Sequence, residues 1–268
     1  MRWGSVCSIR VVLAATLTVL WMAAEPASGQ PAAPRTADGR PNLNGIWQAL
    51  NTANWDVEAH EARPGPPKLG ALLAAPAGLG VVDGPIPYQP WAAAKKKENF
   101  DKRWTDDPEA KCYLPGVPRA NYMPFPFQIV QGTDKIMMIY EYAAAARTIH
   151  FGTVPESPID TWMGHSVGRW DTHTLVVDVT SFNGMAWFDR AGNFQGESLR
   201  VTERYTPAGA DVLTYEATIE DPTMYTRPWT MRMPLYRRLD KGVQLLEFKC
   251  VPFSEELLYG DLRKKPTR

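Results

Sequence analysis

The sequence predicts a mainly β protein whose strands form an antiparallel up-and-down barrel. From about residue 128 onward, successive short segments alternate apolar and polar residues and are rich in β-branched and aromatic side chains. Turn residues separate these segments, as in Gly132-Thr133-Asp134 and Asp240-Lys241-Gly242. Almost no helical pattern intervenes, and closing the sheet into a barrel removes its exposed edges. A strongly bent open sheet is the alternative.

The N-terminal residues 1–29 carry the pattern of an export signal. Arg2 and Arg10 supply positive charge, an apolar stretch follows, and Ala27-Ser28-Gly29 offers a small-residue cleavage site before Gln30. The apolar stretch is shorter than the roughly 20 residues of a membrane-spanning helix, and no later stretch approaches that length. We therefore expect a mature protein that is periplasmic or secreted and has no membrane span.

The mature chain divides into an arm and a barrel. Residues 30–44 predict a flexible leader, and residues 45–127 predict a long proline-rich arm that wraps the barrel. Residues 128–268 are expected to form the barrel and to pack with the arm as one unit. Pro90 suits the first position of one short helix that ends near Trp104. Strands are expected near residues 42–48, 128–132, 135–143, 146–151, 163–171, 174–181, 198–206, 211–220, 229–238 and 243–251.

Composition excludes several classes of partner. Lys and Arg total 29, as do Asp and Glu, so the chain lacks the basic excess expected of a nucleic-acid-binding protein. The run Lys95-Lys96-Lys97 is followed by Glu98 and predicts a solvated helix face. The sequence has no glycine-rich phosphate loop or dinucleotide motif, and its histidines lack zinc-site spacing. We expect no cofactor and no metal.

Cys112 and Cys250 are the two cysteines beyond the predicted export signal. In an oxidising compartment such an isolated pair predicts a disulfide. A reactive thiol is the alternative interpretation.

Charged or titratable side chains occupy strand faces that otherwise look apolar. Alternation places Glu141, Arg147, His165, Asp178 and Glu203 on such faces. One explanation is a buried ion pair of Arg147 with Glu141 or Glu203, because an unpaired buried charge is costly. The other explanation is that these side chains line a ligand cavity inside the barrel.

In the second explanation the same side chains form a catalytic site. His165 and Asp178 are the candidate acid–base pair, with Glu141 and Glu203 as further catalytic candidates. Arg147 would orient the substrate or stabilise a developing anion. Abundant aromatic residues suit a pocket for a flat or apolar small molecule. The candidate substrate-binding residues are Arg147, Trp170, Asn183, Trp187, Tyr215 and Trp229.

Gly164-His165-Ser166-Val167-Gly168 matches the G-x-S-x-G pattern of the serine-hydrolase nucleophile elbow. An elbow needs a strand before the serine and a helix after it. Here a β-branched run follows instead, and the only histidine after Ser166 is His173, too close in sequence for a hydrolase triad. The pattern therefore gives weak support to a hydrolase.

A set of short motifs spans nearly all of the mature chain. They are Asn42-Leu43-Asn44-Gly45-Ile46-Trp47, Ile86-Pro87-Tyr88-Gln89-Pro90-Trp91-Ala92, Asp107-Pro108 with Cys112, Gly116-Val117-Pro118-Arg119, Gly164-His165-Ser166-Val167-Gly168-Arg169-Trp170, Thr174-Leu175-Val176-Val177-Asp178, Phe182-Asn183, Thr202-Glu203-Arg204 and Asp221-Pro222. The set resembles that of a group of exported bacterial proteins, departing from it at Thr172-His173, where a Gly-Asp turn is expected. More loosely, the chain is similar to calycin-like (lipocalin-like) barrels, a class that includes lipid carriers and cofactor-free hydratases and cyclases acting on isoprenoids.

Three functions follow from these observations. The first is an exported, cofactor-free enzyme of the lyase, isomerase, cyclase or hydratase type, acting by acid–base chemistry on an apolar or aromatic small molecule in the barrel. The second is a non-catalytic carrier or envelope binding protein that uses the same cavity. The third is a serine hydrolase that uses Ser166. We favour the enzyme, because a carrier rarely needs both signs of charge on apolar strand faces.

Overall fold

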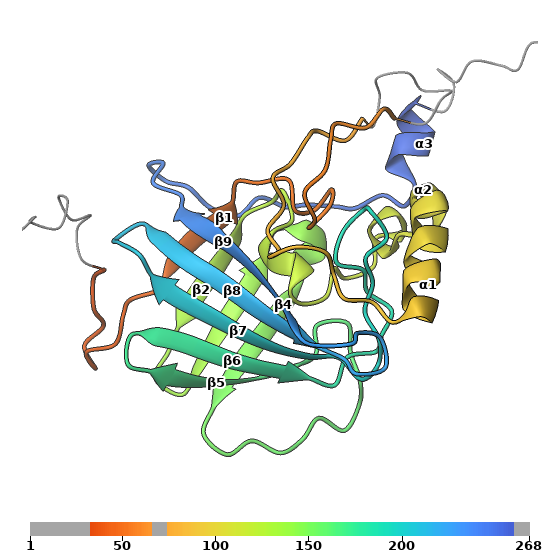
Figure 1. Ribbon diagram of the computed structural model, residues 1–268. Coiled ribbons are helices and arrows are strands. Elements are labelled where there is room, and N and C mark those ends of the chain that lie inside the picture. Colours follow the sequence, from red (N-terminus) through yellow and green to blue (C-terminus); the bar gives the residue numbers. More distant parts are fainter. Residues whose placement is uncertain (1–32, 66–73, 260–268) are drawn as a thin grey trace, which may run out of the picture.

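The computed structural model describes residues 33–65 and 74–259. The predicted export signal and the first residues of the predicted leader lie outside this range. Within it, the strands close into a barrel, and helices α1, α2 and α3 gather on one side of the molecule (Figure 1). None of the helices in these residues has the length and apolar character that crossing a membrane requires.

The predicted closed barrel and mainly β fold are confirmed. Nine strands follow one another around the barrel in sequence order. Most of their bounds lie within two or three residues of those that the alternating pattern predicts. The strands are β1 (Gly45–Ala49), β2 (Phe127–Gln131), β3 (Lys135–Tyr140), β4 (Ala146–Phe151), β5 (His165–Asp171), β6 (Thr174–Thr180), β7 (Arg200–Pro207), β8 (Val212–Glu220) and β9 (Trp229–Arg237).

One pair of strands departs from the predicted up-and-down order. β4 and β5 run parallel, with Ile149 opposite Ser166, whereas all other neighbours are antiparallel. The prediction of a purely antiparallel meander is therefore wrong at this point. The physical reason is parity: nine strictly alternating strands would bring β1 and β9 together in parallel. The return of the chain through residues 152–164 reverses the direction once, so that β1 and β9 close the barrel antiparallel.

β1 closes the barrel although it lies within the segment assigned to the arm. Trp47 is opposite Phe127 of β2 on one side and Arg237 of β9 on the other. Because β9 is thereby paired along both edges, no edge remains for a further strand. The strand predicted at 243–251 is accordingly wrong, and this segment is irregular.

The predicted helix is present at α1 (Pro90–Asp101), with the proline at its first turn, and a short α2 (Arg103–Asp106) continues it. Single turns of 3₁₀ helix follow in the arm and after β3, and a short α-helix lies near the C-terminus. These are η1 (Pro108–Lys111), η2 (Arg119–Asn121), η3 (Tyr142–Ala144) and α3 (Ser254–Tyr259).

Side chains at alternate strand positions fill the barrel. In β8, Leu213, Tyr215, Ala217 and Ile219 are buried while the residues between them are partly exposed. Trp47 of β1 is also fully buried, and its indole N–H donates to the Leu43 carbonyl at 2.8 Å. The interior is therefore a packed core, as the two-residue period of a strand requires.

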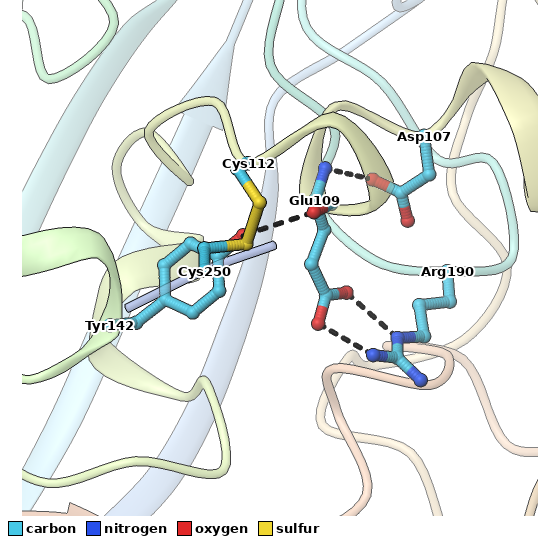
Figure 2. Close-up of a disulfide and its surroundings, with 6 residues drawn as sticks. All are labelled: Asp107, Glu109, Cys112, Tyr142, Arg190 and Cys250. Atoms are coloured by element: carbon cyan, nitrogen blue, oxygen red, sulfur yellow. Dashed lines mark hydrogen bonds and ion pairs between the residues drawn. A yellow bond between two sulfur atoms is a disulfide. The ribbon is translucent and has the colours of Figure 1, made fainter. Parts of the chain in front are cut away.

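The predicted disulfide between Cys112 and Cys250 is confirmed. It fastens the irregular segment after β9 to the arm just beyond η1, where the Tyr142 hydroxyl donates to the Glu109 carbonyl (Figure 2). Phe248, two residues before Cys250, packs against Tyr142 with ring centroids 5.3 Å apart. The covalent link holds a segment that contributes no strand to the barrel.

Replacing both Cys112 and Cys250 with serine should lower the free energy of unfolding, by up to about 5 kcal/mol for so long a loop in the chain-entropy model. The bridged cysteines are 138 positions apart. Urea denaturation of the double variant beside the unreduced parent measures the difference. Equal midpoints, or free thiols in the unreduced, denatured parent, would contradict the expectation.

Candidate functional site

A carboxylate lies inside the barrel. Glu203 of β7 is fully buried. Its Oε1 accepts hydrogen bonds from Asn121 Nδ2 at 2.8 Å, from the Tyr205 hydroxyl at 2.9 Å and from the Tyr215 hydroxyl at 2.8 Å. The Arg147 guanidinium, from β4, donates to Oε2 at 2.6 Å and to Oε1 at 3.1 Å. Glu203 is thus both charge-paired and surrounded by donors.

Arg147 is held as closely as its partner. It donates from Nε to the Tyr140 hydroxyl at 3.1 Å and from Nη2 to the Tyr205 hydroxyl at 2.8 Å. Burial raises the pKa of Tyr140 to about 12. Burial and the neighbouring Glu203 charge raise the pKa of Tyr205 well above its ordinary value. Burial opposes the charge of Arg147, but Glu203 outweighs it and raises the pKa of the guanidinium. The phenols therefore stay protonated as donors, and the ion pair stays charged.

This network confirms the buried ion pair of Arg147 with Glu203, one of the two explanations that the sequence offered. The predicted residue Tyr215 belongs to it through its bond to Glu203. Because the charged groups are satisfied by one another and by hydroxyl and amide donors, the network joins β4, β7 and β8 to η2. The role of this network is structural, because it holds these strands and η2 together.

The other three charged candidates do not join this network, and their predicted inward orientation is wrong. His165 and Asp178 lie on the outer face of β5 and β6, as the pairing of Val167 with Asp178 shows. Asp178 forms an ion pair with Arg169 and accepts from Thr202 Oγ1 at 2.9 Å. Glu141 lies just past β3, where it accepts from the Leu246 amide at 2.9 Å.

The physical reason for the error at His165 is that small residues occupy the inner face of β5, whereas Glu141 lies beyond the end of β3. Ser166 and Gly168 point inward, while the more apolar-looking Val167 lies outside. A Cβ at Gly168 would come within 2.7 Å of Ile149 Cγ2, so this inner position has no room for a side chain. Ser166 is buried inside a continuous strand, so the strand–turn–helix geometry of a nucleophile elbow does not occur there.

The predicted aromatic and amide residues are dispersed. Trp229 is buried edge-on against Phe188, with centroids 5.4 Å apart. Trp170 lies toward the other end of β5, where the Arg40 guanidinium is 5.8 Å from its ring. Asn183 accepts from the Met185 amide at 3.2 Å. Trp187 borders a surface groove beside α1. The predicted residues therefore do not converge on one pocket.

A groove of about 340 Å³ opens where β4 and β5 diverge. Parallel pairing covers only Ile149–Phe151 of β4, and the chain before β5 turns away to pair with the end of β6. There the Thr161 amide donates to the Ser181 carbonyl at 2.9 Å. Gly164 makes this turn possible with a φ of +68°, and a Cβ there would come within 2.8 Å of the Thr180 carbonyl oxygen.

Two histidines lie side by side in this β4–β5 groove. The rings of His150 and His165 stack with centroids 5.8 Å apart and planes 20° from parallel. The Nε2 atom of His165 is buried and has no hydrogen-bond partner among the described residues. Imidazoles donate and accept hydrogen bonds and exchange protons near neutral pH. In residues 33–65 and 74–259 no third His, Cys, Asp or Glu joins them as a potential metal ligand.

An aromatic pair borders the same groove. Trp162 lines it, and its ring stacks on that of Tyr113 at a centroid distance of 5.0 Å. Leu114 adds an apolar side chain to the wall. The groove therefore combines an apolar wall with two imidazoles. No local sequence pattern places His150 beside Trp162, because only the parallel pairing of β4 and β5 brings residues 146–150 beside 161–166.

A second buried charge cluster fixes the arm beside the barrel. Arg119 of η2 donates to both Asp107 oxygens at 2.9 and 3.1 Å and to Glu109 Oε2 at 2.6 Å. Figure 2 shows Arg190 approaching the same Glu109 carboxylate, with contacts of 2.7 and 2.6 Å. Burial opposes the charge on Glu109, but Arg190 and Arg119 outweigh it and lower its pKa to about 2. No strand or helix period in the sequence relates these residues to one another.

Asp189 ties the β6–β7 loop to the arm. It is fully buried and accepts from the amides of Val57 and Ala191, each at 2.9 Å. It also accepts from the Asn193 amide at 3.2 Å and from Asn193 Nδ2 at 2.6 Å. Burial and the nearby Asp56 carboxylate outweigh these donors and raise the pKa of Asp189 to about 7.

The chain matches no protein-family model, and no curated protein matches it. Any functional inference for this protein therefore rests on the geometry of the site.

Replacing Glu203 with glutamine should lower the free energy of unfolding by about 3 to 5 kcal/mol, because Arg147 would keep a buried charge without its counter-ion. Asp178→Asn is the matched control. It removes a carboxylate whose side chain is 47% exposed and should cost less than about 1 kcal/mol. Denaturant titration of both variants tests this, and similar losses would contradict a special role for the interior pair.

Asp189 should make stability depend on pH. Its pKa is higher in the folded protein than the ordinary 3.8, so the folded state binds the proton more tightly. The contribution is present below about pH 4 and is lost as the pH rises through about 7, up to about 4 kcal/mol at ~1.4 kcal/mol per pKa unit. We expect the stability of the parent relative to Asp189→Asn to fall over that range.

Urea denaturation of both proteins at several pH values measures this difference. Asp240→Asn, at a carboxylate whose side chain is 66% exposed, is the control and should show no such trend. A difference between parent and Asp189→Asn that stays constant with pH would mean that Asp189 is ionised throughout.

Proposed function

We propose that the protein is an exported small-molecule binding protein and that the β4–β5 groove holds an apolar or aromatic ligand with a hydrogen-bonding group. The observation that carries this proposal is His165, whose buried Nε2 has no hydrogen-bond partner among the residues that the structure describes and which lies in a groove bordered by Trp162. Leaving a buried polar group unpaired costs about 1 to 3 kcal/mol, and a ligand or water that pairs with it removes that cost.

The composition of the groove suits this class of ligand. Trp162, stacked on Tyr113, offers an apolar surface, and His150 and His165 offer polar contacts at one position. Ligand sites in proteins typically combine such an apolar lining with a few convergent polar groups. Arg147, which lines this groove together with Ser166, is already paired with Glu203, and this favours the histidines over the interior ion pair as ligand contacts.

Acid–base catalysis in the same groove is the second candidate. The stacked rings of His150 and His165 favour it, because neighbouring imidazoles can donate and accept protons on one bound molecule. Asp178 is bound by Arg169 and Thr202 and takes no part in this acid–base mechanism. The groove then acts on the same apolar or aromatic substrate without a cofactor.

Export and the calycin-like resemblance remain part of the proposal. The export-signal pattern of residues 1–29 supports export, and the Cys112–Cys250 disulfide is compatible with an oxidising compartment. A mature N-terminus at Gln30 in the secreted or periplasmic fraction is the expected result, and a full-length protein retained in the cytoplasm would contradict it. The closed barrel supports a likeness to calycins at the level of architecture.

Purified residues 30–268, incubated with a metabolite extract of the source organism and then filtered, should retain one compound detectable by mass spectrometry. His165→Ala should weaken retention about tenfold or more, the effect of losing a hydrogen bond to a buried group. His173→Ala is the matched control, since His173 lies exposed in the β5–β6 turn.

Stoichiometric retention that depends on His165 supports a binding protein. Catalytic conversion of one compound into another, lost in His165→Ala and kept in His173→Ala, supports the enzyme instead. Neither retention nor conversion, or a ligand bound equally by all three proteins, would contradict both functions of this groove.

A further inference from the structure

A second groove, of about 690 Å³, lies between α1, the β6–β7 loop and the turn between β8 and β9. It shares no lining residue with the β4–β5 groove. Asn99 of α1 joins two of its borders by donating to the Gly192 carbonyl at 3.3 Å, and α1 lies beside this loop in Figure 1. We call it the α1 groove.

Trp91 presents an exposed ring in a fixed orientation. The residue is 56% exposed, although its indole N–H donates to the Thr223 carbonyl at 3.0 Å. Its ring also meets Phe194 edge-on, with centroids 6.5 Å apart and planes at 75°. A large aromatic side chain anchored by its edge and its N–H keeps its face available. That face is a ready surface on which a flat ligand can stack.

A buried carboxylate oxygen without a partner lies beside the same groove. Asp221 is 2% exposed, and its Oδ1 accepts from the Thr223 amide at 2.9 Å and from Thr223 Oγ1 at 2.6 Å. Its Oδ2 has no hydrogen-bond partner in the described part of the chain. This oxygen lies against Gly196 of the groove lining, where a Cβ would be only 2.4 Å away. Asp221 lies behind this lining and is not part of it, so a hydroxyl donor in the groove would reach the oxygen through a bridging water.

One turn thus positions both groups. The carbonyl of Thr223 holds the Trp91 indole, and its amide and hydroxyl hold the Asp221 carboxylate. The stacking surface and the hydrogen-bond acceptor therefore have a fixed relation to each other. Such pre-organisation lowers the cost of binding a rigid ligand.

The charges that line the α1 groove balance, and the buried Asp221 carboxylate behind the lining adds one negative charge. Lys95 and Lys111 line it together with Asp106 and Glu197, two of each sign. Lys95 is moreover paired with Glu98 at 3.0 Å. A groove of this kind favours a ligand without net charge that can both donate and accept hydrogen bonds around its edge, while one face remains apolar.

We propose that the α1 groove binds the ring of a neutral carbohydrate. The apolar C–H face of a pyranose ring stacks on the Trp91 indole, whose π face is electron-rich. One of its hydroxyl groups bonds to Asp221 through a bridging water, and the others exchange hydrogen bonds with the lysines and acids at the rim. This inference is independent of the function proposed for the β4–β5 groove.

The test is titration of purified residues 30–268 with cellohexaose, xylohexaose, maltohexaose and chitohexaose, followed by calorimetry and saturation-transfer NMR. At least one oligosaccharide should bind. Trp91→Ala should weaken that binding about tenfold, and Trp91→Phe, which keeps a ring, should weaken it less. Asp221→Asn, which keeps an acceptor for Thr223, should also weaken it.

Two controls separate this site from the rest of the molecule. Tyr236→Ala removes a ring that is 38% exposed on β9, and His165→Ala alters the β4–β5 groove; both should bind the oligosaccharide as the parent does. The proposal is overturned if no oligosaccharide binds, if Trp91→Ala binds normally, or if His165→Ala abolishes binding. Binding of phenethylammonium that depends on Trp91 and Asp221, without sugar binding, would instead assign the groove to cations.

Discussion

The ion pair of Arg147 and Glu203 constrains the rest of the barrel. Both groups are removed from water, and each alone would be strongly unfavourable in the interior. Asn121, Tyr205 and Tyr215 complete the coordination of Glu203. Since a shift of one residue would turn either charge to the outside, the pair fixes the register of the strands that carry it. The interior is consequently filled by the protein's own side chains, with this polar network among them.

The two grooves therefore lie outside the barrel, at points where the regular strand pattern is interrupted. The β4–β5 groove exists because β5 pairs in parallel with the end of β4 only, which leaves the start of β4 without a neighbouring strand on that side. The α1 groove exists because the β6–β7 loop extends outward to meet α1 and the arm. Asp189, Arg119 and Glu109 hold that loop and arm together through buried charges and hydrogen bonds. Arg147 connects the interior to one of these grooves, because it pairs with Glu203 and also lines the β4–β5 groove.

The sequence predicts the strands well because alternation and turn residues are local properties. It predicts strand faces poorly where both faces are covered. In β6, Leu175, Val176 and Val177 are all buried, so alternation cannot decide which way Asp178 points. In β5, Gly168 occupies an inner position for lack of space, and its neighbour Val167 misleads any assignment based on hydropathy.

Contacts between distant positions in irregular chain are also beyond a local pattern. Glu109 and Arg190 are 81 positions apart, with no strand or helix period to relate them. His150 and His165 come together only through the parallel pairing of β4 with β5. The pairing of Arg147 with Glu203 could be predicted from the sequence, because both residues lie on strands and a buried charge needs an opposite charge beside it.

The closure of the barrel by β1 has a consequence for the order of assembly. Gln48 and Arg238, which meet at the seam, are 190 positions apart. A chain that emerges from its N-terminus presents β1 long before its partner β9 exists. Until then β1 has an open edge, which is prone to pair with other chains. Because contacts this remote form slowly, the edge of β1 stays open to aggregation until the last strand has been made and paired.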